Sequence, residues 1–149
     1  MQPVGIGYAL GDDSQELLKP PIVTDPQTGE RFYAEPAVEP FTVALLANQE
    51  RRDLSQFFGR DCAFLWTGLA GNSTGVYQTQ FIIPPDNRLL STAPVNNVNM
   101  VGTAQFPVPI WPAIKVPPGS RIGIYLLDTS GAGNTVQLVF YGVRLFRVR

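Results

Sequence analysis

From Pro40 onward, the chain consists of short apolar runs separated by Gly, Pro, Asn and Asp. Residues 76–83 alternate cleanly, with Tyr77, Thr79, Phe81 and Ile83 on one face and Val76, Gln78, Gln80 and Ile82 on the other. A period of two is typical of a β-strand that is buried on one side. The turn residues at 71–75 and 84–87 bound this strand at both ends.

The same pattern predicts further strands at 41–47, 61–69, 121–127 and 135–148. Residues 88–91 are expected to form a short edge strand, and the proline-rich segment 106–112 an edge strand or an extended connection. Gly142 interrupts the last strand and predicts a β-bulge there. The polar segment 49–59 fits either a single helical turn or a wide loop, and the pattern does not choose between them.

The apolar positions that share a face along these strands predict the core. They are Phe41, Val43, Leu45, Phe64, Trp66, Phe81, Ile122, Ile124, Leu126 and Val139. Strands recur about every ten residues, and no amphipathic helical window of useful length interrupts them. We therefore predict an all-β fold over residues 40–149, a β-sandwich of the jelly-roll kind. Jelly-roll and other sandwich topologies remain alternatives.

Residues 1–39 are predicted to form an extended arm, because prolines recur there and the apolar residues show no sustained period. The sequence of residues 25–29 is typical of a type I turn. An arm of this kind is either a loose leader or a segment that orders along a neighbouring subunit. Apolar and aromatic residues favour the second reading and are the candidate interface of the arm: Ile6, Tyr8, Leu17, Leu18, Phe32 and Tyr33.

Charged residues make up 15% of the chain, against about 25% in a typical domain, so the surface is expected to be charge-poor. Such a surface favours burial against neighbouring chains. The net charge is −1 and the Lys and Arg residues form no basic run, which argues against nucleic acid as a partner. No run approaches the roughly 18 apolar residues that cross a bilayer, and no signal peptide pattern opens the chain, so no membrane partner is expected.

The chain contains no histidine, which removes the most common general base and metal ligand. The acidic residues lie mostly in turns or in the arm, so a pair of glycosidase carboxylates is not indicated. We expect no enzymatic activity, no cofactor and no metal. The turn at 128–134 offers oxygen ligands for calcium but lacks several carboxylates, so a plain β-turn is favoured. Cys62, the only cysteine, lies in an apolar run and is expected in the core.

The two tryptophans allow different readings. The neighbours of Trp66 are apolar, which favours core packing over a platform that stacks sugars. Trp111 lies between prolines, and either a surface interface anchor or a sugar platform fits it. Arg147 is expected to protect a strand edge or to contact a subunit. Trp111 and Arg147 thus complete the candidate interface.

Several turn and strand patterns, in this order, resemble small β-sandwich virion proteins of tailed bacteriophages. The resemblance spans residues 40–146 and rests on Phe41 to Gln49, Asp61 to Trp66, Ser73-Thr74-Gly75, Pro107, Pro118 to Arg121, Asp128-Thr129-Ser130 and Gly142-Val143-Arg144. It implies a non-enzymatic structural role, with capsid decoration as the leading expectation and a head–tail or tail position as further possibilities.

The resemblance also implies the partners and the location. The expected partners are the major capsid protein or other virion proteins, and a homo-oligomer, with a trimer favoured, is expected in the particle. The chain would be made in the host cytoplasm and end in the virion. The alternative function is a carbohydrate-binding or receptor-binding module of a phage tail or fibre, in which a tryptophan and nearby asparagines contact glycan.

Overall fold

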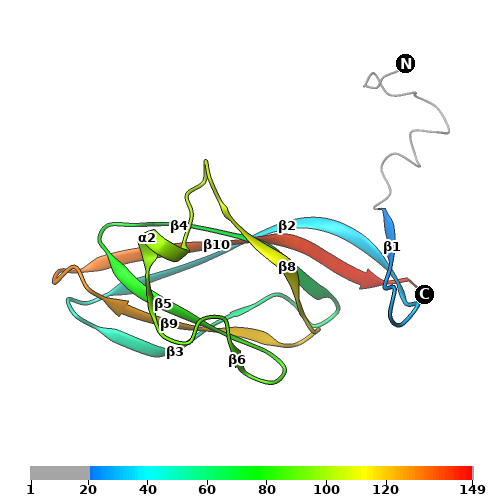
Figure 1. Cartoon of the computed structure of the whole chain (residues 1–149), viewed down its shortest axis with the longest axis horizontal. Coiled ribbons are helices and arrows are strands. Elements are labelled where there is room, and N and C mark those ends of the chain that lie inside the picture. The colour runs from blue at the N-terminus through cyan, green and yellow to red at the C-terminus, as the bar shows by residue number, and fades with distance from the viewer. Residues whose placement is uncertain (1–20, 149) are drawn as a thin grey trace, which may run out of the picture.

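A computed structural model describes residues 21–148, which fold into two antiparallel sheets packed as a β-sandwich (Figure 1). The first sheet has the order β1 (Ile22–Thr24), β2 (Arg31–Leu45), β10 (Asn134–Arg147), β4 (Ala63–Ser73) and β8 (Val108–Val116). The second has the order β3 (Glu50–Phe57), β9 (Arg121–Asp128), β5 (Tyr77–Ile83) and β6 (Arg88–Leu89), and β7 (Val95–Asn96) also pairs with β5. One helical turn, α2 (Asn97–Met100), leads toward β8. The predicted all-β sandwich is confirmed.

Aromatic rings from both sheets fill the centre of the sandwich. The ring of Trp66 lies 5.5 Å from that of Phe81 and 5.3 Å from that of Phe140, and all three side chains are fully buried. Most predicted core residues are confirmed as buried, namely Leu45, Phe64, Trp66, Phe81, Ile122, Ile124 and Leu126. Phe41 and Val43 are partly buried and pack against this cluster.

Val139 is the exception, and its assignment to the core is wrong. Val136, Leu138 and Phe140 are fully buried in β10, whereas Val139 is half-buried. Successive side chains of a strand point to opposite faces, so the residues on either side of Val139 take the core positions and Val139 takes the outer face. Both faces of β10 carry apolar residues around Val139, so the sequence shows no alternation between apolar and polar positions there.

The predicted arm ends too late in the chain. Residues 31–39 belong to β2, and residues 32–39 pair with β10 in an unbroken register that runs to residue 45. Pro36 and Pro40 fit this strand because β1 covers residues 31–33 of it, and no other strand within residues 21–148 pairs with that side of β2. Proline, which has no N–H donor, is tolerated on such an edge. In Figure 1, β2 and β10 extend together beyond the other strands toward β1.

Residues 50–57, for which the pattern left a helical turn or a loop open, form strand β3. Among the described residues, this strand lies at the edge of the second sheet and pairs with β9 alone. Arg51 and Asp53 form an ion pair at 2.8 Å on it. Because an edge strand presents much of its surface to water, it carries charges in place of the apolar alternation that the prediction relied on.

The register between β10 and β4 shifts at Gly142, where the bulge was predicted, but the extra residue lies in β4. Tyr141 pairs with Gly68 and Gly142 pairs with Trp66, so Thr67 of β4 has no partner in β10. A Cβ atom on Gly142 would collide with the carbonyl oxygen of Leu65 and would lie 2.7 Å from Cζ of Phe64. Glycine is therefore required where β10 passes closest to β4.

Candidate interaction surface

Strand β8 carries a large bulge at the outer edge of the first sheet. Trp66 of β4 pairs with Ile114, and Gly68 of β4 pairs with Pro109, so Thr67 alone lies opposite residues 110–113. The extra residues are pushed out of the ladder, and the bulge carries Trp111 with them. The Trp111 side chain is 87% exposed, the most exposed of the large hydrophobic residues in the described part of the chain.

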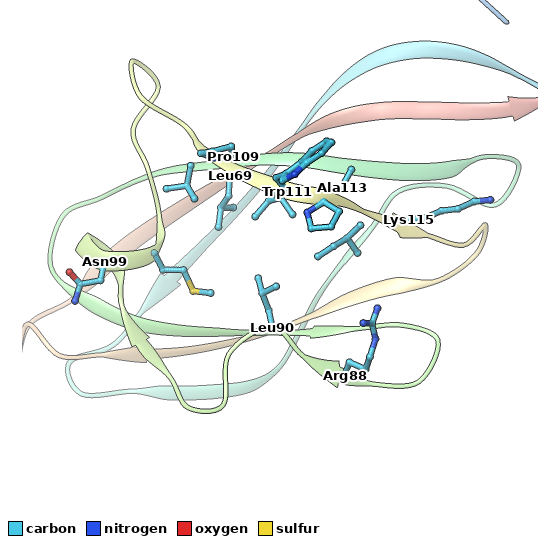
Figure 2. Close-up of a pocket in the computed structure, with 13 residues that line it drawn as sticks. Leu69, Arg88, Leu90, Asn99, Pro109, Trp111, Ala113 and Lys115 are labelled. Atoms are coloured by element: carbon cyan, nitrogen blue, oxygen red, sulfur yellow. The ribbon is translucent and has the colours of Figure 1, made fainter. Parts of the chain in front are cut away.

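A hollow of about 670 Å³ lies beside this bulge. It is bounded by β8, by β6 and the residues after it, and by α2, and thus lies where the edges of the two sheets approach each other (Figure 2). In Figure 2, Leu90 points from the β6 side toward β8. Most of the lining is apolar and includes Leu69, Leu90, Met100, Val108, Ile110 and Ile114.

The ionisable groups of the lining are both cations, Arg88 and Lys115. Arg88 forms an exposed ion pair with Asp86 at 3.2 Å. The ammonium of Lys115 lies 3.8 Å from the carboxylate of Asp25 and 5.1 Å from the centre of the Phe32 ring. Each of the two cations is thus paired with a carboxylate outside the lining, and the hollow itself is mostly apolar.

Further exposed hydrophobic residues lie on the segments that surround the hollow. Val98 belongs to α2, Phe106 to the loop that precedes β8, and Leu89 to β6, and all three are more than half exposed. None of these three side chains lines the hollow. We call Trp111 and the hollow the Trp111 surface. A large exposed apolar side chain beside an apolar hollow is typical of a site of contact with another molecule.

The other predicted interface residues do not join this surface. Phe32 is buried, together with Ala34, Ala63 and Leu145, in a second small cluster, so its assignment to the interface is wrong. Sequence periodicity did not reveal this because the arm was not expected to form a strand. Tyr33 and Arg147 are exposed near the ends of β2 and β10, and Arg147 pairs there with Glu30. Ile6, Tyr8, Leu17 and Leu18 lie outside the described residues.

Trp66 takes the core role that its neighbours indicated. Its indole Nε1 donates a hydrogen bond of 2.8 Å to the carbonyl oxygen of Gly68, and none of its side chain is exposed. A sugar could therefore stack on Trp111 but not on Trp66. Cys62 is also buried, as predicted.

The loop at 128–134 is organised around a buried carboxylate. Asp128 accepts hydrogen bonds from the hydroxyl of Ser130 at 2.6 Å, the side-chain amide of Asn134 at 3.0 Å and the backbone N–H of Asn48 at 2.8 Å. These bonds, with that of the Ser130 hydroxyl the largest contribution, hold the pKa of Asp128 well below its ordinary value. The Asp128 carboxylate thus connects the turn that contains Asn48 with the loop at 128–134. Residues 21–148 gather no cluster of three acidic, cysteine or histidine side chains.

Sequence reasoning identified Trp111 but missed the hollow beside it. The hollow joins residues from four separate segments, and no local period connects Leu90 or Met100 to β8. The one signal in the sequence was the spacing of Pro109 and Pro112 around Trp111, since prolines within a strand indicate an edge or a bulge.

Comparisons of the chain with protein-family models, with curated proteins and with solved structures found no match. Within the described residues, the single short helix falls far short of the length needed to cross a membrane.

Proposed function

We propose that the protein is a non-enzymatic structural protein of a virus particle that acts through contacts between subunits, most concretely a capsid decoration protein. The observation that carries this proposal is the position of Trp111, which stands almost fully exposed on a bulge of an edge strand beside an apolar hollow. The major capsid protein, or another virion protein, is the proposed partner.

Contact of the Trp111 side chain with water is energetically unfavourable. An exposed tryptophan next to other apolar side chains forgoes a large burial energy, and such residues dominate the binding energy of protein interfaces. The chain also has few charges to oppose association, because only 15% of its residues are charged. These features also support self-association, and a trimer on the particle remains part of the proposal.

The proposed mechanism is stabilisation by mass action. A protein that binds an assembled shell, and not its separated parts, stabilises the shell at each site by RT ln(1 + [L]/Kd). About 2.7 kcal/mol follows when the free protein is at 100 times its Kd. Repetition over many sites strengthens the shell without any chemical step, which suits a chain that contains no histidine.

The proposal is tested by co-sedimentation of the purified chain with particles stripped of it. Trp111→Ser should weaken binding at least about 30-fold, because an interface anchor contributes about 2 kcal/mol or more. Leu46→Ser is the matched control, since Leu46 is also well exposed but lies in the turn after β2 and outside the lining of the hollow. Equal binding by the two variants would contradict the role of Trp111.

A second candidate function is carbohydrate binding, which the shared position of Trp111 and Asn99 around the hollow favours. An indole face stacks on sugars, and an amide hydrogen-bonds to hydroxyls. Because Trp66 is fully buried, a change in tryptophan fluorescence during a glycan titration would report on Trp111. A saturable shift that Trp111→Ser abolishes would support this function over capsid decoration.

A further inference from the structure

The side of the first sheet that faces away from the core carries no charged side chain over the middle of β2, β10 and β4. Leu138 and Phe140 of β10 are fully buried in the core, so the residues that alternate with them lie on the opposite side. Residues paired across neighbouring strands share a side of the sheet. We call these positions the outer face. They are Pro36, Val38, Pro40, Thr42 and Ala44 of β2, Thr135, Gln137, Val139, Tyr141 and Val143 of β10, and Leu65, Gly68, Ala70 and Asn72 of β4.

The three central rows of the outer face are apolar across all three strands. Val38 is 59% exposed, its neighbours Pro36 and Pro40 are also exposed, and the β10 residues of these rows are partly exposed. An antiparallel sheet with one side in water normally bears polar residues on that side. The rows therefore fit burial against another surface. They are Pro40, Val139 and Ala70; Val38, Tyr141 and Gly68; and Pro36, Val143 and Leu65.

The corresponding side of the second sheet is polar and charged. Gln80 of β5 pairs there with Tyr125 of β9. The Tyr125 hydroxyl donates a hydrogen bond of 2.7 Å to Glu50, and the Arg52 guanidinium lies 4.7 Å from the centre of the Tyr125 ring. The second sheet thus presents groups that water solvates well, and the outer face of the first sheet does not.

We propose that the outer face packs against the same face of a second copy of the chain, as a two-fold dimer. Packed sheets lie about 10 Å apart, with side chains from both faces interdigitating. A two-fold contact places the same patch on both copies, and a face without charges brings no like charges together. The proposal does not rest on a role in a virus particle, and the outer face shares no residue with the lining of the hollow beside Trp111.

The size of the outer face fits a reversible dimer. One position on one side of a sheet covers about 33 Å², so two outer faces in contact bury about 900 Å². That area is larger than most crystal contacts and lies in the range of weak, transient complexes. Tyr141, in the central row, is the aromatic residue that would anchor the contact.

Sedimentation equilibrium of the full chain tests the dimer. The unaltered chain is expected to pass from monomer to dimer between about 1 µM and 1 mM, the affinity range of a weak interface. Val38→Glu should weaken dimerisation at least about tenfold, because it buries a charge in the contact. Val76→Glu is the matched control, since Val76 is 49% exposed but precedes β5 and lies outside the outer face.

Two results of this experiment would overturn the proposal. One is an unaltered chain that stays monomeric, or that forms trimers, over the whole concentration range. The other is a dimer that Val38→Glu and Val76→Glu weaken equally. Thermal denaturation of each variant checks that the chain is folded, and the exposed positions of both valines make an intact fold the expected result.

Charge complementation tests the face-to-face arrangement directly. A chain with Val38→Glu and Thr42→Glu, and a chain with Val38→Lys and Thr42→Lys, should each be monomeric because like charges would meet in the dimer. Mixed together, the two chains should associate, since opposite charges then meet. A tagged glutamate variant is expected to retain the untagged lysine variant on an affinity resin and not an untagged glutamate variant. Equal retention of the two, or retention of neither, would overturn the proposal.

Discussion

Trp66 connects the two sheets at the scale of a single residue. It contacts rings from β5 and β10, and its indole N–H is satisfied by the carbonyl oxygen of Gly68. We predict that Trp66→Ala lowers the free energy of unfolding by about 3–5 kcal/mol, through lost burial and a residual cavity. Urea denaturation followed by circular dichroism measures this change, and a loss below about 1 kcal/mol would show that the core does not depend on this ring.

Asp128 gives the protein a stability that depends on pH. Its folded-state pKa lies below the ordinary value of 3.8, chiefly because the Ser130 hydroxyl and the Asn48 N–H stabilise the charged form. A lowered pKa contributes stability above that ordinary value, and the contribution is lost as pH falls through the folded-state pKa.

We therefore predict that the free energy of unfolding falls less steeply below about pH 4 in Asp128→Asn than in the unaltered chain. A slope remains in the variant because hydrogen bonds from Arg51 lower the pKa of Asp53 to about 2. Urea denaturation at pH 7, 4 and 2.5 compares the two proteins. Parallel pH profiles would show that the Asp128 bonds do not favour the charged carboxylate.

Individual residues also show where sequence reasoning succeeds. Phe81 and Ile124 occupy strands that alternate cleanly, so a period of two was sufficient to place them in the core. Val139 lies in a strand whose two faces are both apolar, and there only the pairing partners decide which face is inward. A period of two therefore predicts that a strand forms, but it does not predict which face of the strand points to the core.

At the scale of elements, β2 shows why the predicted arm was too long. Proline at residues 36 and 40 argued against a central strand, and that argument was correct for a strand with two neighbours. Beyond residue 33, β2 has a neighbour on one side only among the described strands, which sequence alone does not reveal. Strand β3 escaped prediction for a related reason, since an edge strand bears charges where a central strand bears apolar residues.

The length of β2 leads to a prediction about truncation. Removal of residues 1–39 would delete β1 and nine residues of β2, including Phe32 and Ala34 of the second buried cluster. We expect a loss of at least about 3 kcal/mol of stability, comparable to the loss of one large buried side chain. Thermal denaturation measures the effect, and an unchanged midpoint would restore residue 39 as the boundary of the arm.

At the scale of the whole molecule, the edge strands β8 and β6 of the two sheets border the apolar hollow among the described residues. Trp111 stands at this side, carried outward by the bulge of β8. Both sequence interpretations of Trp111, an interface anchor and a sugar platform, place it at the surface, but its surroundings depend on how four distant segments meet. The sequence can therefore predict the exposed residue of such a site. It cannot predict the surrounding surface, because the contacts that shape this surface join residues far apart in the chain.

The central claim is that the protein works by contact with an assembled particle through the Trp111 surface. Its most direct test is quantitative mass spectrometry of particles purified by density gradient from the source of this sequence, with the unaltered chain and with Trp111→Ser. We predict that the unaltered chain bands with the capsid protein at a fixed copy number and that the variant is depleted from the band. Absence of the unaltered chain from the particle band would contradict the account.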